Sequence, residues 1–239
     1  MTTLTSSFAP RAAARVERGG LSARSGTATG LFDPLEPRQL LFVATVANPV
    51  ELFLARLGQT YERTNAEEVA GFGRAVVNVG DIDQDGADDL AIGAPGGGSA
   101  MGLVDVFSGK TGARLWTVAG DAIGFGRALA RVDDVTGDSI SDLAVGSPNS
   151  GSAGSVFIYS GATGSLFGQV IGSEHGAGIG ANFGWSLDSG NADADTSPDL
   201  AIGAPSDGPS YAGRVYLINV ASAATIRILN GSEPGQLLG

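Results

Sequence analysis

The sequence predicts an all-β fold built from repeated four-stranded units. An aspartate-rich loop occurs three times, and each copy lies between two short apolar segments. The segments that follow each loop are rich in β-branched and aromatic residues and are bounded by glycine, which is typical of short strands and tight turns. Glycine accounts for 38 of 239 residues, yet 43% of the residues are hydrophobic. This composition favours a packed core over a disordered chain.

The strands are expected in the same order in each repeat. Phe-Gly pairs begin the repeats at positions 72, 125 and 183, so the period is about 55 residues. In each repeat one strand precedes the acidic loop and three follow it: 74–79, 89–94, 103–108 and 113–119; then 127–132, 142–147, 155–160 and 165–171; then 185–189, 199–204, 214–220 and 225–230. Four strands of about six residues with their turns match the size of one blade of a β-propeller.

The expected domain of repeats covers residues 71–239. Its units are 71–120, 124–172 and 182–231, and residues 232–239 resemble the start of a fourth unit, with Leu238 where phenylalanine stands in the others. Three blades form a partial ring whose exposed blade faces and sheet edges favour association. Further blades from a longer chain, or self-association, would complete such a ring.

The N-terminal part of the chain differs from the repeats. Residues 1–47 are expected to form a poorly ordered, export-type leader, and residues 48–70 a connecting segment that could be an extra strand or a short helix. No stretch approaches the roughly 18 apolar residues of a membrane-spanning helix. No transmembrane segment is therefore expected.

The acidic loops predict metal binding. Each loop places oxygen-bearing side chains at its positions 1, 3, 5 and 9: Asp81, Asp83, Asp85 and Asp89; Asp134, Thr136, Asp138 and Asp142; Asn191, Asp193, Asp195 and Asp199. Carboxylates about 4 Å apart repel by about 4 kcal/mol per pair at an effective dielectric constant near 20. A hard cation such as Ca²⁺ relieves this repulsion. The alternative is three Asx-type turns that need no ion.

The charge distribution excludes some functions. The net charge of −11 comes entirely from residues 71–239, and most of their acidic residues are aspartate. Nucleic-acid binding, which needs a basic patch, is therefore not expected. The chain has no cysteine and a single histidine, His175, in a glycine-rich connection. With no Gly-x-Ser-x-Gly motif either, neither catalytic residues nor an organic cofactor site is expected.

The repeat resembles a known family at these residues. The order Phe-Gly, Asp-x-Asp-x-Asp-Gly-x-x-Asp-Leu and Gly-Ala-Pro, seen most completely from Gly71 to Pro95, is similar to the FG-GAP repeat of integrin α-chain propellers and related bacterial surface proteins. The resemblance implies a seven-bladed propeller with Ca²⁺ in the hairpin loops of certain blades. It also implies a main-chain carbonyl ligand at position 7, which is Ala87, Ile140 or Ser197.

The second and third loops depart from the family pattern. Thr136 replaces aspartate at position 3 of the second loop, and Ser139 replaces glycine at position 6. The third loop begins with Asn191 and has Thr196 at position 6. It also lies one residue nearer its Phe-Gly pair, so a bulged or a trimmed first strand is expected there. These departures put the metal affinity of both loops in doubt.

A second resemblance concerns location. Residues 35–41 read Leu-Glu-Pro-Arg-Gln-Leu-Leu and resemble a segment near the start of large secreted or surface proteins of some bacteria, planctomycetes especially. It implies an exported protein, extracellular or at the cell surface. The alternative is a flexible leader that carries no export signal.

The expected function is a non-enzymatic, calcium-binding propeller segment of an exported protein that takes part in adhesion or in binding a protein or glycan. The partner class follows from the family resemblance. Two alternatives remain open: an accessory propeller of a larger secreted enzyme such as a hydrolase, and a purely structural scaffold.

Overall fold

The fold is known from a computed structural model, which describes residues 71–193 and 195–239. The expected leader, 1–47, and connecting segment, 48–70, lie outside the described residues. The strands are β1 (Ala75–Gly80), β2 (Asp89–Ala94), β3 (Leu103–Phe107), β4 (Arg114–Ala119), β5 (Leu129–Val132), β6 (Asp142–Ser147), β7 (Ser155–Tyr159), β8 (Leu166–Ile171), β9 (Ser186–Gly190), β10 (Asp199–Ala204), β11 (Arg214–Asn219) and β12 (Thr225–Asn230). Two short 3₁₀ helices lie in connections: η1 (Gly172–His175) between β8 and β9, which links the second and third sheets, and η2 (Pro209–Tyr211) between β10 and β11.

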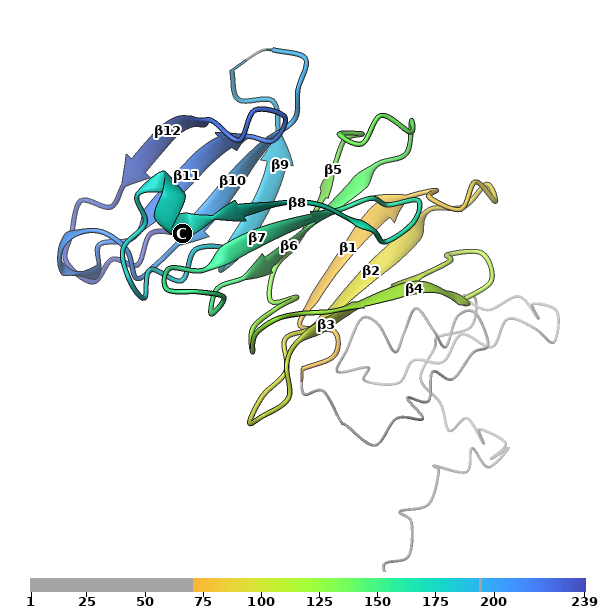
Figure 1. Cartoon of the computed structure of the whole chain (residues 1–239), viewed down its shortest axis with the longest axis horizontal. Coiled ribbons are helices and arrows are strands. Elements are labelled where there is room, and N and C mark those ends of the chain that lie inside the picture. Colours follow the sequence, from red (N-terminus) through yellow and green to blue (C-terminus); the bar gives the residue numbers. More distant parts are fainter. Residues whose placement is uncertain (1–70, 194) are drawn as a thin grey trace, which may run out of the picture. The chain divides into compact units, whose positions relative to one another are not determined.

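The strands form three four-stranded sheets, which follow one another in chain order (Figure 1). Each sheet is a meander in which consecutive strands pair antiparallel: β1 to β4, β5 to β8 and β9 to β12. The predicted all-β fold of about three propeller blades is therefore confirmed. Among the described residues there is no α-helix.

The hydrophobic core lies between neighbouring sheets. The first strands of the sheets are neighbours, with β5 in contact with both β1 and β9. One cluster of buried side chains joins the first and second sheets, through residues such as Val106 and Val145. A second cluster joins the second and third sheets, through residues such as Val156 and Ile202. Apolar contact between whole blade faces therefore holds the repeats together.

Two of the three phenylalanines of the Phe-Gly pairs pack into these clusters. Phe125 is fully buried, with ring centroids 5.6 Å from Phe157 and 6.1 Å from Tyr159. Phe183 is equally buried and forms a bridge with Gly154. Leu238 forms the corresponding bridge with Gly213 at the third sheet.

The first strands of the repeats differ by a bulge. In the first sheet the register shifts between Asn78 and Gly80, so β1 carries an extra residue opposite β2. β9 pairs with β10 without any irregularity. Of the two alternatives for the shorter third repeat, the strand is trimmed, because β9 pairs regularly up to Gly190, directly before the loop.

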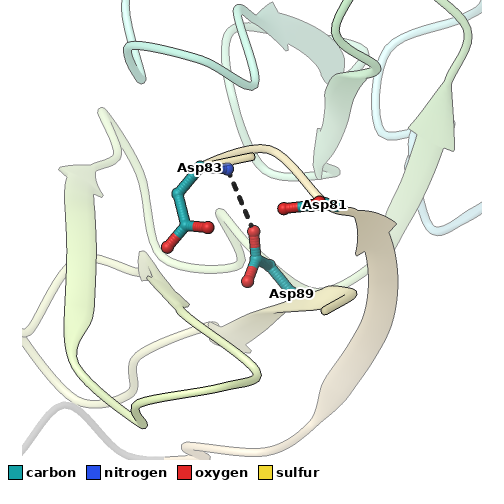
Figure 2. A group of neighbouring side chains, drawn as sticks. All are labelled: Asp81, Asp83 and Asp89. Atoms are coloured by element: carbon teal, nitrogen blue, oxygen red, sulfur yellow. Dashed lines mark hydrogen bonds between the residues drawn. The ribbon is translucent and has the colours of Figure 1, made fainter. Parts of the chain in front are cut away.

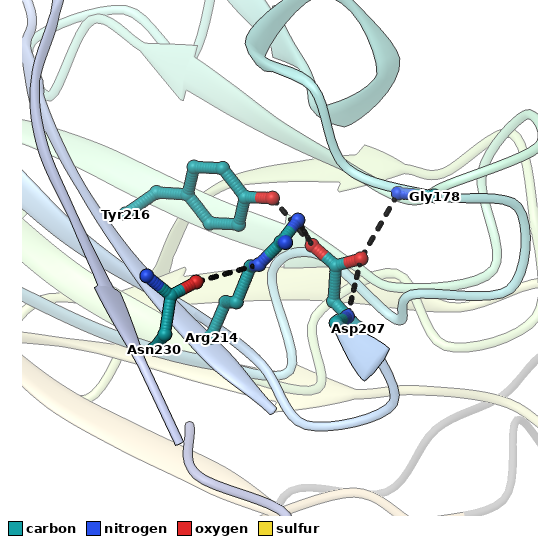
Figure 3. A network of polar contacts seen from close by, with 6 residues as sticks. Gly178, Asp207, Arg214, Tyr216 and Asn230 are labelled. Atoms are coloured by element: carbon teal, nitrogen blue, oxygen red, sulfur yellow. Dashed lines mark hydrogen bonds and ion pairs between the residues drawn. The ribbon is translucent and has the colours of Figure 1, made fainter. Parts of the chain in front are cut away.

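A buried polar network joins the third sheet to the segment before it (Figure 3). Asp207 is buried, and its carboxylate accepts hydrogen bonds from Tyr216 and from the backbone N–H groups of Gly178 (3.1 Å) and Gly208 (2.8 Å). Arg214 lies 3.4 Å away in an ion pair. Burial raises the pKa of Asp207, but the hydrogen bonds and the arginine outweigh burial and hold this pKa below its usual value.

Candidate metal centre

The first acidic loop gathers three carboxylates at one point (Figure 2). Asp81 follows the end of β1, Asp89 begins β2, and Asp83 lies in the loop between them. One oxygen from each side chain lies within 4.8 Å of those of the other two. The hairpin therefore presents three negative oxygens at a single place.

Hydrogen bonds within the loop set this arrangement. The two carboxylate oxygens of Asp81 accept hydrogen bonds from the backbone N–H groups of Asp85 (2.9 Å) and Gly86 (2.9 Å). The chain can turn this tightly because Gln84 and Gly86 adopt positive φ angles of 59° and 92°. Glycine takes this conformation without steric cost, which explains its place at position 6.

Asp89 is the buried member of the group. It is 0% exposed, and its carboxylate accepts hydrogen bonds from the backbone N–H groups of Ile82 (2.8 Å) and Gly109 (2.8 Å). Burial raises the pKa of Asp89 above its usual value, although these hydrogen bonds act in the opposite direction. The Asp89 carboxylate therefore links the loop to the β3–β4 hairpin by a hydrogen bond and also lies close to the carboxylates of Asp81 and Asp83.

Asp85 is not part of the three-residue group. Its carboxylate accepts hydrogen bonds from the backbone N–H of Ala87 (3.0 Å) and from the hydroxyl of Ser108 (3.2 Å). The Lys110 ammonium donates to the main-chain oxygen of Asp85. Asp85 and Ala87, both predicted ligands, thus lie beside the group and shape the turn that carries it.

The second loop has the same backbone but a different interior. Asp134 accepts hydrogen bonds from the backbone N–H groups of Gly137 and Ser139 (2.7 Å), and the bond from Ser139 is the main cause that lowers the pKa of Asp134. The hydroxyl of Thr136 lies 3.4 Å from Asp134 and 3.3 Å from Asp142. A neutral hydrogen-bond donor therefore stands between two of its carboxylates.

Asp142 occupies the same buried place as Asp89. Its carboxylate accepts hydrogen bonds from the backbone N–H groups of Val135 (2.8 Å) and Gly161 (3.1 Å), and burial raises its pKa. Asp138 accepts a hydrogen bond from the backbone N–H of Ile140 (2.9 Å). Among the residues that the structure describes, the acidic side chains of this loop do not form a three-carboxylate group.

The third loop also contains amide donors. The Asn219 side chain donates to Asp195 (3.1 Å) and Asp199 (3.3 Å), and the Asn191 amide donates to the main-chain oxygen of Asp195. Within the loop, backbone N–H groups donate to Asp193 and Asp195, the second of these bonds coming from Ser197. In the described part of this loop, which lacks residue 194, no three acidic side chains converge.

One set of residues that contacts these loops was not expected from the sequence. The aspartate at position 5 of each loop is met by a polar side chain from the end of the third strand: Ser108 in the first repeat, Ser160 (3.4 Å) in the second and Asn219 in the third. A polar residue recurs 22 to 24 positions after each of these aspartates. That spacing is the signal by which these contacts could have been found.

The donor set of the first loop fits a hard divalent cation. Three carboxylates supply only oxygen, the ligand type that Ca²⁺ and Mg²⁺ prefer. The ion pairs formed within the described residues are Arg114 with Asp105 and Arg214 with Asp207, so no basic side chain neutralises this group. The loop could therefore hold a metal ion.

The repeats match a known family model. The FG-GAP repeat model matches residues 72–113, 125–159 and 183–218, one match for each sheet. Among curated proteins, integrin alpha-V of Gallus gallus is 31% identical over 176 residues, which cover 65% of this chain and 16% of that protein. Integrin alpha-3 of Mus musculus is 36% identical over 154 residues, covering 58% of this chain and 14% of that protein.

The relatives also include an enzyme. Phosphatidylinositol-glycan-specific phospholipase D of Homo sapiens is 34% identical over 148 residues, covering 52% of this chain and 18% of that protein. The chain thus spans less than a fifth of the length of these relatives. In the described residues no helix is long and apolar enough to cross a membrane. With three matched repeats, one on each four-stranded sheet, residues 72–218 belong to the FG-GAP repeat family and form blades of an integrin α-type propeller.

Proposed function

We propose that the first acidic loop binds Ca²⁺ and that the ion stabilises the propeller without taking part in catalysis. The convergence of Asp81, Asp83 and Asp89 supports this proposal. Asp85 and the Ala87 carbonyl would complete the ligand set with water, after a small shift of the turn. Ca²⁺ accepts six to eight oxygens in flexible geometry, which suits this loop better than the strict octahedron of Mg²⁺.

The second and third loops would bind the ion more weakly. Before a cation enters the second loop, the Thr136 hydroxyl must turn away from two carboxylates. In the third loop the Asn219 amide must release Asp195 and Asp199. Their proposed ligands are Asp134, Thr136, Asp138, Ile140 and Asp142, and Asn191, Asp193, Asp195, Ser197 and Asp199.

Thermal unfolding of the chain tests the metal proposal. A ligand at a hundredfold excess over its dissociation constant stabilises a protein by about 2.7 kcal/mol. In a domain of 150–250 residues this raises the midpoint by roughly 5–10 °C. We expect that rise between EDTA and excess Ca²⁺, and a smaller one with Mg²⁺.

Two matched variants complete the experiment. Asp83→Asn removes one charge from the group and should abolish most of the calcium-dependent rise. Asp88→Asn removes the same charge from an exposed neighbour outside the group and should retain it. An equal midpoint in EDTA and Ca²⁺ for the unaltered chain would show that the metal proposal is wrong.

We further propose that these blades are a non-enzymatic binding module of an exported or surface protein. The similarity to integrin α chains supports an adhesion or interaction role, and the integrins supply the extracellular context. Affinity capture with the chain from surface proteins and glycans tests this role. A reproducible partner is expected, and consistent absence of any partner would leave the scaffold alternative.

The similarity to a phospholipase favours a second candidate function, an accessory propeller of a secreted hydrolase. In this case the propeller would position a catalytic domain and would not itself hydrolyse a substrate. The chain incubated with a glycosylphosphatidylinositol-anchored protein should release none of it under either proposal. Release would contradict the non-enzymatic role.

A further inference from the structure

One position of the repeat carries unusual side chains. The residue after each Phe-Gly pair is Arg74, Arg127 or Trp185, and it directly precedes or lies close to the first strand of its sheet. The backbone N–H of each donates to a carbonyl three residues earlier, namely that of Gly71, Gly124 or Asn182. Since β1, β5 and β9 are neighbours, the three positions follow one another along one edge of the blades.

Two of these side chains stack across the boundary between sheets. The Arg127 guanidinium carbon lies 3.2 Å from the ring centroid of Trp185. A guanidinium over an indole ring is held by cation–π attraction. Trp185 remains 38% exposed, so the stacked pair is accessible from solvent. The stack orients the arginine without neutralising its charge.

The positive charge at this edge is unbalanced. Within the described residues, neither Arg74 nor Arg127 forms an ion pair, and the Nε atom of Arg127 is buried without a hydrogen-bond partner. Burial and the nearby charge of Arg74 both lower the pKa of Arg127. Two guanidinium groups therefore act on each other where the rest of residues 71–239 is strongly acidic. An anion placed between the two guanidinium groups would offset both the burial of Arg127 and its repulsion from Arg74.

We propose that Arg74, Arg127 and Trp185 form a recognition surface for an acidic segment of a protein partner. Guanidinium groups bind carboxylates through paired, charge-assisted hydrogen bonds, which explains why arginine stands at two of these positions. Val76 lies on the same face of β1 as Arg74. Its side chain and the indole ring of Trp185 offer apolar contacts for the residues beside the carboxylate.

The same charges argue against a long polyanion. Residues 71–239 hold eighteen acidic and seven basic side chains, so the surface beyond the arginines would repel a nucleic acid or a sulfated polysaccharide. A short segment with one or two carboxylates would contact only the basic edge. This inference rests on the proposed binding role but not on the metal loop, which lies at the opposite end of β1 from Arg74.

An octapeptide array tests the proposal with the full chain. Each peptide carries Asp or Glu at two adjacent central positions, and each has a counterpart with Asn or Gln. We expect the chain to bind acidic peptides in preference to their amide counterparts, with affinity that falls as salt is added. If no acidic octapeptide binds more strongly than its counterpart, the proposal is wrong.

Matched variants locate the binding. For the best acidic peptide, Arg74→Gln and Arg127→Gln should each lower the affinity at least tenfold. Arg227→Gln removes the same charge from the exposed strand β12 and should leave the affinity unchanged. Equal losses in all three variants would show a general charge effect and would overturn the assignment. Because Arg74 is exposed, its variant remains informative even if Arg127→Gln unfolds the chain.

Two further measurements distinguish this inference from its alternatives. Preferential binding of heparin over the acidic peptides would identify a polyanion site and contradict a peptide partner. The array is read in both Ca²⁺ and EDTA. A chain that is stabilised by calcium but binds no acidic peptide contradicts only this inference, whereas peptide binding without calcium stabilisation contradicts only the metal proposal.

Discussion

In the first acidic loop three carboxylates converge within 4.8 Å, whereas in the second loop the Thr136 hydroxyl lies between Asp134 and Asp142. The two loops otherwise share their frame. Both have left-handed residues at positions 4 and 6, and both bury the aspartate at position 9 against the following hairpin. The side chain at position 3 therefore changes the electrostatics of the loop without changing its backbone.

The aspartates of these loops combine two roles. The carboxylate at position 9 is a structural acceptor for backbone N–H groups in every repeat. The carboxylates at positions 1 and 3 decide whether negative charge accumulates. Where negative charge accumulates, a cation would stabilise the loop; where a hydroxyl or an amide intervenes, hydrogen bonds would partly replace the cation.

The largest effect is expected from removing the shared structural acceptor. Asp89→Ala and Asp142→Ala should each lower the free energy of unfolding by about 3 kcal/mol, because buried N–H groups lose their acceptor. Urea unfolding measures the change. Asp88→Ala, at an exposed site next to Asp89, is the control; it removes only the exposed hydrogen bond from the Asn78 side chain and should cost less than about 1 kcal/mol. Equal losses at positions 88 and 89 would contradict the structural role.

Exchanging position 3 between the loops tests the comparison directly. Asp83→Thr should remove most of the calcium-dependent stabilisation, about 2.7 kcal/mol at a hundredfold excess of ion over its dissociation constant. Thr136→Asp should create a second calcium-dependent increment. Calorimetric titration with Ca²⁺ counts the sites in each variant. If Thr136→Asp leaves the number of sites unchanged, position 3 does not decide metal binding.

Asp207 forms an ion pair with Arg214, so a change of pH tests how much the charge of this aspartate contributes to stability. The pKa of Asp207 is held below its usual value of 3.8, so its stabilisation is complete above that value and is lost as pH falls through the lowered pKa. Asp207→Asn should cost about 2 kcal/mol near neutral pH, and less as the pH falls toward 2. Unfolding free energies of both chains across that range measure this. A difference independent of pH would contradict a role for the charge.

The smallest effect is expected at position 6 of the two loops. Gly86 has a positive φ of 92° and open space beside it, so Gly86→Ala should cost about 1 kcal/mol through backbone strain alone. Ser139 adopts φ of 67°, and Ser139→Gly should stabilise the chain by a few tenths of a kcal/mol because strain relief exceeds the added chain entropy. Thermal midpoints measure both changes. A loss in Ser139→Gly as large as that in Gly86→Ala would show that strain is not the cause.

Much of the fold could be predicted from the sequence. The strand expected over 89–94 is β2, and that expected over 225–230 is β12, because glycine and proline mark the ends of segments whose strand character is local. Position 6 of the second loop was less predictable. Serine there departs from the family pattern, yet Ser139 takes the left-handed conformation that the hydrogen bonds to Asp134 require.

The amino-acid order alone predicts the repeat, its strands and the placement of the acidic loops, since turn residues and strand alternation act over a few residues. The tertiary structure decided which carboxylates meet, because the β3–β4 hairpin that fastens Asp89 and contacts Asp85 comes some twenty residues later. It also decided that Arg127 stacks on Trp185 from the next sheet. Both contacts join segments far apart in the chain, and only the packing of the strands brings their side chains within range.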